Sequence, residues 1–177
     1  MKKLSLNELG RPNLETYLIS QKNPFVVVLD NVRSMHNIGS VFRTSDAFSA
    51  EKIYLCGITA TPPHREIHKT ALGAEDSVAW EYAEHTHLLI PILKAEGYTI
   101  ACVEQAEGST NLQNFIPEPG RKYAFVFGNE VFGVDDEVVA KADICLEIPQ
   151  FGTKHSFNIS VTTGIVLWQY ICGLKRS

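Results

Sequence analysis

Short apolar runs alternate along this chain with stretches in which apolar residues recur at helical spacing. An apolar run of roughly four to eight residues is typical of a strand buried on both faces of a parallel sheet. The runs predict strands at residues 25–30, 53–56, 77–82, 98–104, 123–127 and 144–148. The stretches between them predict helices at residues 38–48, 65–72, 86–96, 135–142 and 158–173. Strands and helices in alternation predict an α/β fold, with a parallel sheet covered by helices on both faces.

The remaining segments predict how the domain is bounded. Residues 59–64 and 105–122 are interrupted by Pro, Gly or Asn and predict loops. A chain of 177 residues suits one core, so we expect residues 1–24 to be an extension that packs on a single domain of residues 25–177. No apolar run approaches the roughly 18 residues that a membrane helix needs, and the N-terminus lacks the apolar core of a secretory signal. We therefore expect a cytoplasmic protein without a membrane partner.

Charge bears on the choice of partner more than overall composition does. Hydrophobic residues make up 45% and charged residues 20% of the chain, which is ordinary for a globular domain. The net charge of −4 counts mildly against nucleic-acid binding, which usually leaves a basic footprint. Basic side chains nevertheless gather in the first third of the chain, at Arg33, Arg43, Arg65 and Lys69. A local basic face is therefore compatible with an acidic protein.

The cysteines and histidines give no sign of a metal site. The four cysteines are widely spaced without a C-x-x-C pair, so we expect reduced, mostly buried thiols at Cys56, Cys102, Cys145 and Cys172. His64 and His68 lie four residues apart, but the zinc-protease pattern needs Glu after the first His, and this chain has Arg65 there. The sequence also lacks the glycine-rich dinucleotide fingerprint, the P-loop and the G-x-S-x-G nucleophile elbow.

The first polar segment that carries candidate chemistry follows the strand at 25–30. Asn37 can cap the helix that begins there, and Gly39 permits a close backbone approach. Arg43 offers a guanidinium fork that suits phosphate oxygens. Asn37 and Arg43 lie six residues apart, so they share no helical face unless Asn37 stands outside the helix. The alternative is structural: a capping Asn and a surface Arg.

Two further polar segments follow the strands at 123–127 and 144–148. In the second segment, Gly128 and Gly133 bracket Asn129 and Glu130. A glycine there lets a flat ligand approach the backbone closely. The alternative, to which we give equal weight, is a turn with a capping Asn. The third segment, residues 148–160, leads into the last helix, which Ser156 or Asn158 can cap. Ligands of parallel sheets bind at the carboxyl ends of strands. We therefore expect the three segments to form one site.

Taken together, the three segments resemble the SpoU family of the SPOUT RNA methyltransferases. The family patterns N-x-G-x-x-x-R-T, G-x-E-x-x-G and I-P…S-x-N-x-S occur here in that order, beginning at Asn37, Gly128 and Ile148. The resemblance covers about residues 25–172. The chain departs from common family residues at Phe157, and at Ser49 and Val131, where glycine is common. None of these departures removes a polar group that the chemistry needs.

This resemblance implies a fold and an activity. The fold is a Rossmann-like SPOUT fold with a parallel sheet and a deep C-terminal trefoil knot. The general rule that protein chains are not knotted would have excluded this knot. The activity is 2′-O-ribose methylation of RNA with S-adenosylmethionine as donor, no metal, and a homodimer with each site at the subunit interface. The residues implied for catalysis are Arg43, Asn37, Glu130, Ser156 and Asn158. Those implied for the donor are Val103, Gly128, Ile148, Gln150 and Phe157.

The resemblance favours tRNA as the substrate, with the guanosine of the D-loop as the target and ribosomal RNA as the alternative. Two other functions remain open at this point: an inactive RNA-binding module of the same fold, and an unrelated α/β enzyme acting on a nucleotide or metabolite. The family proposal is that the RNA phosphate helps Arg43 accept the 2′-hydroxyl proton. Unperturbed arginine stays protonated, so orientation and electrostatic stabilisation by Arg43 are at least as plausible.

Overall fold

One parallel sheet organises the protein in the computed structural model, which describes residues 1–5 and 7–175. In this part of the chain the sheet has seven strands in the order β3-β2-β1-β6-β4-β7-β5, and each strand runs parallel to its neighbours. The strands are β1 (Asn23–Asp30), β2 (Ala50–Cys56), β3 (Trp80–Ala83), β4 (Tyr98–Val103), β5 (Thr110–Asn111), β6 (Lys122–Phe127) and β7 (Ile144–Glu147). Residues 176 and 177 of the predicted domain lie outside the described residues.

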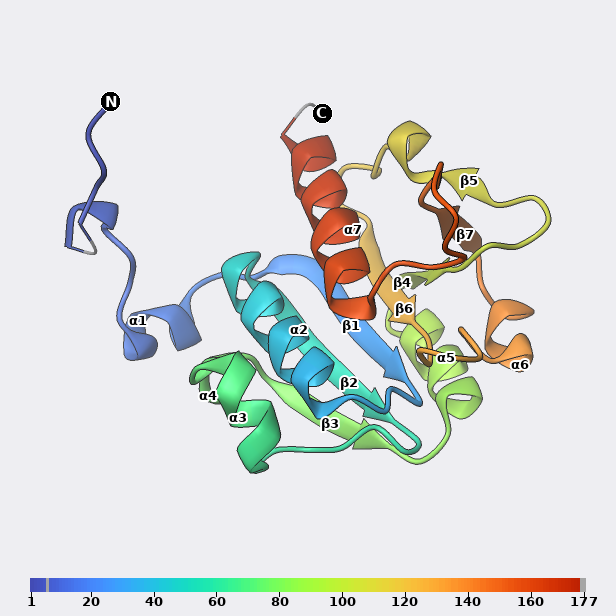
Figure 1. The fold of residues 1–177 in the computed structure, drawn as a ribbon, viewed down its shortest axis with the longest axis horizontal. Helices are drawn as coiled ribbons and strands as arrows, with labels where there is room; N and C mark the ends of the chain where they lie inside the picture. Colours follow the sequence, from blue (N-terminus) through green and yellow to red (C-terminus); the bar gives the residue numbers. More distant parts are fainter. Residues whose placement is uncertain (6, 176–177) are drawn as a thin grey trace.

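Helices cover both faces of this sheet, as the alternating pattern predicts (Figure 1). The α-helices are α1 (Leu14–Ile19), α2 (Met35–Ala47), α3 (Arg65–Ala71), α4 (Ala74–Ser77), α5 (Thr86–Ala95), α6 (Asp136–Val139) and α7 (Ile159–Leu174). Short 3-10 helices lie at η1 (Asn7–Leu9) and η2 (Leu112–Asn114). The parallel α/β fold expected from the sequence is therefore confirmed.

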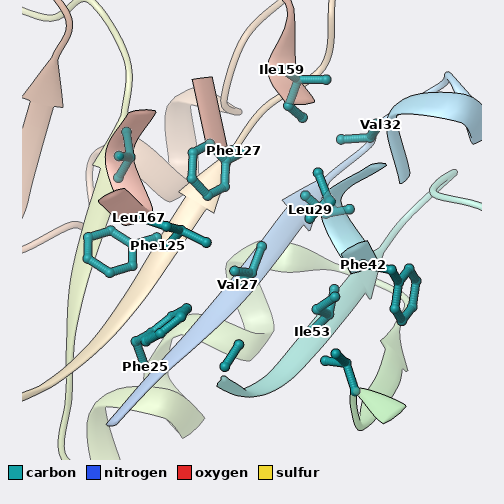
Figure 2. Close-up of a cluster of buried hydrophobic side chains, with 14 of the residues drawn as sticks. Phe25, Val27, Leu29, Val32, Phe42, Ile53, Phe125, Phe127, Ile159 and Leu167 are labelled. Atoms are coloured by element: carbon teal, nitrogen blue, oxygen red, sulfur yellow. The ribbon is translucent and has the colours of Figure 1, made fainter. Parts of the chain in front are cut away.

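Strand β1, which lies between β2 and β6, separates two apolar cores. Successive side chains of a strand point to opposite faces, and here Val27 and Leu29 pack with α2 and α7 (Figure 2). Val26 and Val28 pack in the second core with residues of α5 and α6. The strand is buried on both faces, which explains why it appears in the sequence as a continuous apolar run.

Several predicted boundaries differ from the observed ones. The helix predicted at 38–48 is α2, and it begins at Met35. Ser34 caps it by accepting a hydrogen bond from the backbone N–H of Asn37. Asn37 therefore lies inside α2 and is not its cap. Residues 74–77 form the helical turn α4, so the strand predicted at 77–82 begins only at Trp80. The helix predicted at 135–142 is confined to Asp136–Val139. The loop predicted at 105–122 contains β5 and η2.

The extension before β1 contains η1 and α1, which the apolar pattern did not predict. No residue of α1 is buried, and apolar side chains such as Leu14, Leu18 and Ile19 are exposed. The Tyr17 hydroxyl donates a hydrogen bond to the Asp46 carbonyl at the end of α2. This is a contact between the extension and the domain.

Close approach of α2 and α3 depends on Gly39. A Cβ at this position would lie 2.2 Å from both the Ile67 carbonyl oxygen and the Thr70 hydroxyl oxygen. The backbone of α3 cannot retreat without disturbing the packing of the buried Ile67 side chain. The expectation of a close backbone approach at Gly39 is therefore confirmed.

We expect Gly39→Ala to lower the free energy of unfolding by about 1–3 kcal/mol, because the added methyl group overpacks a helix contact. The matched control is Gly164→Ala in α7, where a Cβ would meet nothing within 4 Å. There the loss of backbone freedom in the unfolded chain should stabilise the protein by about 0.5–1 kcal/mol. Urea unfolding of both variants at one protein concentration measures the difference; equal effects would contradict this account of the α2–α3 contact.

Candidate active site

Three loops converge at the carboxyl edge of the sheet, after β1, β6 and β7. β1 and β6 are neighbours, with Leu29 paired to Phe127, so the segments that follow them start side by side. The segment after β7 leads into α7, which packs beside α2 on the same face of the sheet (Figure 1). The topology thus brings together the three polar segments that the sequence singled out.

Glu130 connects the second segment to the first. Its carboxylate accepts hydrogen bonds from the backbone N–H groups of Arg33, at 2.9 Å, and Ser34, at 3.0 Å. It also accepts a hydrogen bond from Asn37 Nδ2 at 3.0 Å. These three donors lie at the start of α2, where free N–H groups and the helix dipole favour a negative charge. Glu130 therefore holds the loop after β6 against the N-terminus of α2.

Asn158 connects the third segment to the same group. Its Nδ2 donates to Asn37 Oδ1 at 3.1 Å, and its own Oδ1 caps α7 by accepting from the Ser160 backbone N–H at 2.9 Å. The prediction that Ser156 or Asn158 caps this helix is thus confirmed for Asn158. Asn158, Asn37 and Glu130 form one hydrogen-bonded chain, which we call the polar chain. It joins all three loops.

The pKa of the Glu130 carboxyl lies below its ordinary value of 4.5. Partial burial acts to raise this pKa, but hydrogen bonds from the Arg33 backbone, the Asn37 side chain and the Glu130 and Ser34 backbones outweigh it. Glu130 is therefore ionised at neutral pH and serves as a hydrogen-bond acceptor.

Gly128 has a structural role within its own loop. A Cβ on Gly128 would lie 2.0 Å from the Gly133 carbonyl carbon and 2.1 Å from the Val134 backbone nitrogen. The glycine is thus required where the loop after β6 folds back on itself, with Asn129 and Gly133 exchanging backbone hydrogen bonds. Gly128 also lines the cavity described below, so the approach of a flat ligand to its backbone stays a prediction.

Two residues that hold these loops, Glu104 and Asp30, were not assigned a role from the sequence. Asn129 caps its turn, as the structural alternative predicts, because its Oδ1 accepts from the Val131 and Phe132 backbone N–H groups. Asn129 donates to the Asn31 carbonyl at 2.7 Å. The Glu104 carboxylate accepts from the Val134 backbone N–H at 3.0 Å. Asp30 is buried at the end of β1, and its carboxylate accepts from the Thr86 hydroxyl, from Asn31 Nδ2 and from the Asp135 backbone N–H. Asp30 had a visible signal: it is a charged residue that closes an apolar strand.

A cavity of about 510 Å³ lies against these loops. All five residues expected to hold the donor line it: Val103, Gly128, Ile148, Gln150 and Phe157. Glu130, Ser156 and Asn158 also line it. Ser156 is exposed, and Gln150 reaches the His155 carbonyl with its Nε2 at 3.5 Å. The cavity therefore collects eight of the ten residues that the sequence proposed for the site.

Arg43 and Asn37 are the two that do not line this cavity. Asn37 is bound to two residues that do, Glu130 and Asn158. Arg43 lies six residues further along α2, so the two side chains leave the helix about 120° and 9 Å apart. Arg43 is exposed, and within the described chain its side chain makes no hydrogen bond or ion pair. A single chain does not bring Arg43 to the polar chain.

Ser49 stands where the family often has glycine, and the structure explains that preference. Its backbone adopts a left-handed conformation, with φ of +52°, in the tight connection between α2 and β2. Glycine reaches this conformation without steric cost, whereas serine does so less readily.

A family model described as the SpoU rRNA Methylase family matches residues 24–168. The chain belongs to this family. The alternative of an unrelated α/β enzyme is thereby excluded.

In the part of the chain that the structure describes, no helix is long and apolar enough to cross a membrane.

Relatives in the SpoU family are named for two classes of RNA, tRNA and ribosomal RNA. The tRNA (guanosine(18)-2′-O)-methyltransferase of Borreliella burgdorferi is 26% identical over 94% of this chain and 75% of its own length. The 23S rRNA (guanosine-2′-O-)-methyltransferase RlmB of Neisseria meningitidis is 30% identical over 81% of this chain, which spans only 56% of that relative.

Solved structures of the family share the fold. The TrmH/SpoU tRNA modifying enzyme of A. aeolicus superposes with a TM-score of 0.81 at 26% identity, covering 92% of this chain and 81% of its own. An AdoMet-bound rRNA methyltransferase from Sinorhizobium meliloti gives a TM-score of 0.78 at 30% identity, covering 84% of this chain and 56% of its own.

The depressed pKa of Glu130 predicts a pH-dependent stability. A carboxyl whose pKa is lower in the folded than in the unfolded protein stabilises the fold fully above its unfolded pKa. This contribution is lost as the pH falls through the folded pKa. We expect Glu130→Gln to be less stable than the parent by about 1 kcal/mol at pH 7, with the difference shrinking as pH falls below about 4. Denaturant titrations at pH 7 and pH 3 test this. A difference that grows towards low pH would contradict it.

Proposed function

We propose that this protein is an S-adenosylmethionine-dependent RNA 2′-O-ribose methyltransferase. The observation that carries the proposal is the polar chain of Asn158, Asn37 and Glu130 beside a cavity lined by the residues expected to hold the donor. Membership of the SpoU family and the names of its relatives support it. The intact Arg43, Glu130 and Asn158 argue against an inactive RNA-binding module of the same fold.

The cavity fits the donor in size and chemistry. Its volume of about 510 Å³ lies in the usual range of small-molecule sites, roughly 300–1,000 Å³. Apolar side chains at Val103, Ile148 and Phe157 offer surfaces for a flat ring, and polar groups at Glu104 and Gln150 lie among them. S-adenosylmethionine supplies an activated methyl group on a sulfonium. The residues of this chain bind it and hold it in one orientation.

The polar chain positions groups for methyl transfer to a ribose hydroxyl. A 2′-hydroxyl is a poor nucleophile that must lose its proton during in-line attack. Glu130 is committed to three donors at the start of α2, so we assign it to holding the pocket and not to accepting this proton. Arg43 binds the RNA phosphate, orients the ribose and stabilises the negative charge that develops on the hydroxyl oxygen.

Arg43 performs this role at the site of a second copy of the chain, in a homodimer with each site at the subunit interface. Its exposed guanidinium has no partner among the described residues and does not line the cavity of its own chain. An apolar surface for a second copy exists on α7, where Val161 is 49% and Trp168 60% exposed. Large exposed apolar groups on a helix are typical of a protein interface.

tRNA is the proposed substrate, with the D-loop guanosine as the target. Several relatives with high coverage of this chain are named tRNA (guanosine(18)-2′-O)-methyltransferases, from Borreliella burgdorferi and Thermus thermophilus among others. Ribosomal RNA is the second candidate, because relatives from Neisseria meningitidis and Sinorhizobium meliloti are named for rRNA. Free thiols at all four cysteines are consistent with a cytoplasmic location.

The deep trefoil knot also belongs to this proposal. β7 lies between β4 and β5 in the sheet, and the chain then passes through residues 148–158 to α7. α7 packs close to the segment after β5, since a Cβ at Gly173 would lie 2.3 Å from Pro117 Cδ. This arrangement is compatible with threading of the last segment. An experimental density trace of residues 104–174 decides whether the chain passes through the loop.

We expect Arg43→Ala to lower the turnover of methyl transfer by about 100-fold or more, as for loss of a group that stabilises transition-state charge. Donor affinity should stay within about twofold, because Arg43 does not line the cavity. Incorporation of labelled methyl into unmodified tRNA and ribosomal RNA measures activity, and calorimetric titration with S-adenosylmethionine measures binding. Near-parental turnover of this variant would remove Arg43 from the mechanism. A parent that binds no donor and methylates neither RNA would refute the proposed function.

Mixed dimers test which subunit supplies Arg43. Arg43→Ala and Glu130→Ala are each expected to be inactive when pure. If Arg43 acts across a two-fold interface, a mixed dimer has one intact site, so random exchange of equal amounts should restore about a quarter of the parental activity. If Arg43 acts within its own chain, no site is intact and mixing restores nothing. Unmixed variants at the same total concentration are the control.

A further inference from the structure

The walls of the proposed donor cavity carry negative charge without a matching cation. Glu104, Glu130 and Glu147 line this cavity, and its lining includes no Lys or Arg. None of the ion pairs among the described residues involves these three carboxylates. His155 also lines the cavity, but it is exposed to solvent. Glu130 is satisfied by its donors at the start of α2, which leaves the charges of Glu104 and Glu147 without a counterpart.

These two glutamates lie at the adjoining ends of β4 and β7. Val103 pairs with Leu146 in the two parallel strands, so the residues that follow them, Glu104 and Glu147, occupy neighbouring positions. The Glu104 backbone N–H donates to the Leu146 carbonyl at 3.1 Å, which keeps the two chains together at this point. Neighbouring strands are about 4.8 Å apart, and like charges on them repel each other. A cation in the cavity relieves this repulsion.

The Glu104 carboxylate is held in one place by the backbone around it. Its Oε1 accepts from the Gln105 backbone N–H at 2.8 Å, and its Oε2 accepts from the Val134 backbone N–H at 3.0 Å. Gly133 makes room for it, because a Cβ there would lie 2.1 Å from Glu104 Oε2. A fixed charge acts on a bound ligand over several ångström and needs no direct hydrogen bond to it.

The Glu147 carboxylate is held from the loop that follows β4. Its Oε2 accepts from the Ser109 hydroxyl at 2.7 Å. Glu104 and Glu147 are both half-buried, so water and salt screen their charges less than on an open surface. Both stand at the β4–β7 side of the cavity, whereas the polar chain leaves from the β1–β6 side. The negative charge therefore lies away from α2.

The donor and the product of the proposed reaction differ by one charge. S-adenosylmethionine carries a sulfonium, an ammonium and a carboxylate, so it is a net cation at neutral pH. Methyl transfer breaks the bond from sulfur to the methyl carbon, and the electron pair stays on sulfur. The 2′-oxygen forms the new bond to carbon, and its proton is released. S-adenosylhomocysteine, the product, is a thioether without net charge. Acidic walls therefore attract the donor more strongly than the product.

We propose that Glu104 and Glu147 make this cavity selective for the sulfonium form of its ligand, so that the donor binds more tightly than the demethylated product. Coulomb attraction at roughly 6 Å in a half-buried site is enough for about a tenfold preference. The same walls that hold the donor thus favour exchange of the product after turnover. The inference rests on the proposed function for the identity of the ligand.

Calorimetric titration without RNA tests the preference. The ligands are S-adenosylmethionine, S-adenosylhomocysteine and sinefungin, an unreactive analogue that carries an amine in place of the sulfonium. The parent should bind both cationic ligands about tenfold more tightly than S-adenosylhomocysteine. Glu104→Gln and Glu147→Gln should each narrow this preference about threefold, and the double variant should abolish it. The matched control Glu107→Gln, on an exposed residue after β4 that does not line the cavity, should leave it unchanged.

The neutral ligand separates a loss of charge from a loss of structure. S-adenosylhomocysteine affinity should stay within about twofold of the parent in each variant, because this ligand has no net charge. Glu147→Gln is the safer variant, since an amide oxygen can still accept from the Ser109 hydroxyl. High salt should narrow the preference of the parent and leave the double variant unaffected. Equal affinity of the parent for all three ligands, or an undiminished preference in the double variant, would overturn the proposal.

Turnover assays distinguish this inference from the proposed function. In Glu147→Gln, the product should inhibit at about threefold lower concentration relative to KM for the donor. A parent that methylates RNA but binds donor and product equally would leave the methyltransferase standing and this inference refuted. A parent that binds none of the three ligands would refute both.

Discussion

The buried carboxylate of Asp30 is the constraint on which the carboxyl edge of the sheet depends. A charge that is 1% exposed must be surrounded by hydrogen-bond donors, since an unpaired buried charge would be strongly destabilising. Its donors come from separate elements: Thr86 begins α5, Asp135 precedes α6, and Asn31 opens the loop after β1. The hydrogen bonds to Asp30 therefore hold the starts of α5 and α6, the helices on the face of the sheet away from α2 and α7. They also fix the start of the loop that leads to Asn37.

Much of the fold was predictable because its strands are buried on both faces. β1 and β6 appear as continuous apolar runs, and their order with the intervening helices predicts a parallel sheet. The failures have local causes. Trp80, Glu81 and Tyr82 of the edge strand β3 are exposed, so its sequence has little apolar signal. The start of α2 depends on a cap from Ser34 and a polar first turn, which no apolar periodicity marks.

The candidate site was predictable in its members and not in its contacts. Position after a strand placed the segments of Glu130 and Asn158 in one expected site, because the carboxyl ends of parallel strands share one edge. The family resemblance then selected these two residues within their segments. That Asn37 links them depends on the helix beginning at Met35, which places this side chain against Glu130 in the loop after β6. A second requirement for glycine at Gly128 arises from a loop that folds back on itself, which the composition of the segment does not reveal. The place of Arg43 depends on contacts that a single chain does not contain.

Each hydrogen bond of the polar chain has a fixed donor and acceptor, and the charge of Glu130 determines which is which. An amide side chain can be turned by 180° with little change of shape, so its orientation depends on its partners. Ionised Glu130 can only accept, which forces Asn37 to present its NH₂ group there and its oxygen to Asn158. Asn158 must then donate to Asn37, which leaves its own oxygen to cap α7. Aspartate, an equally good cap, could not replace it, because an ionised carboxylate has no N–H or O–H group to donate to the Asn37 oxygen. The charge of Glu130 in one loop thus determines, through two amide side chains, that the Asn158 oxygen caps the closing helix.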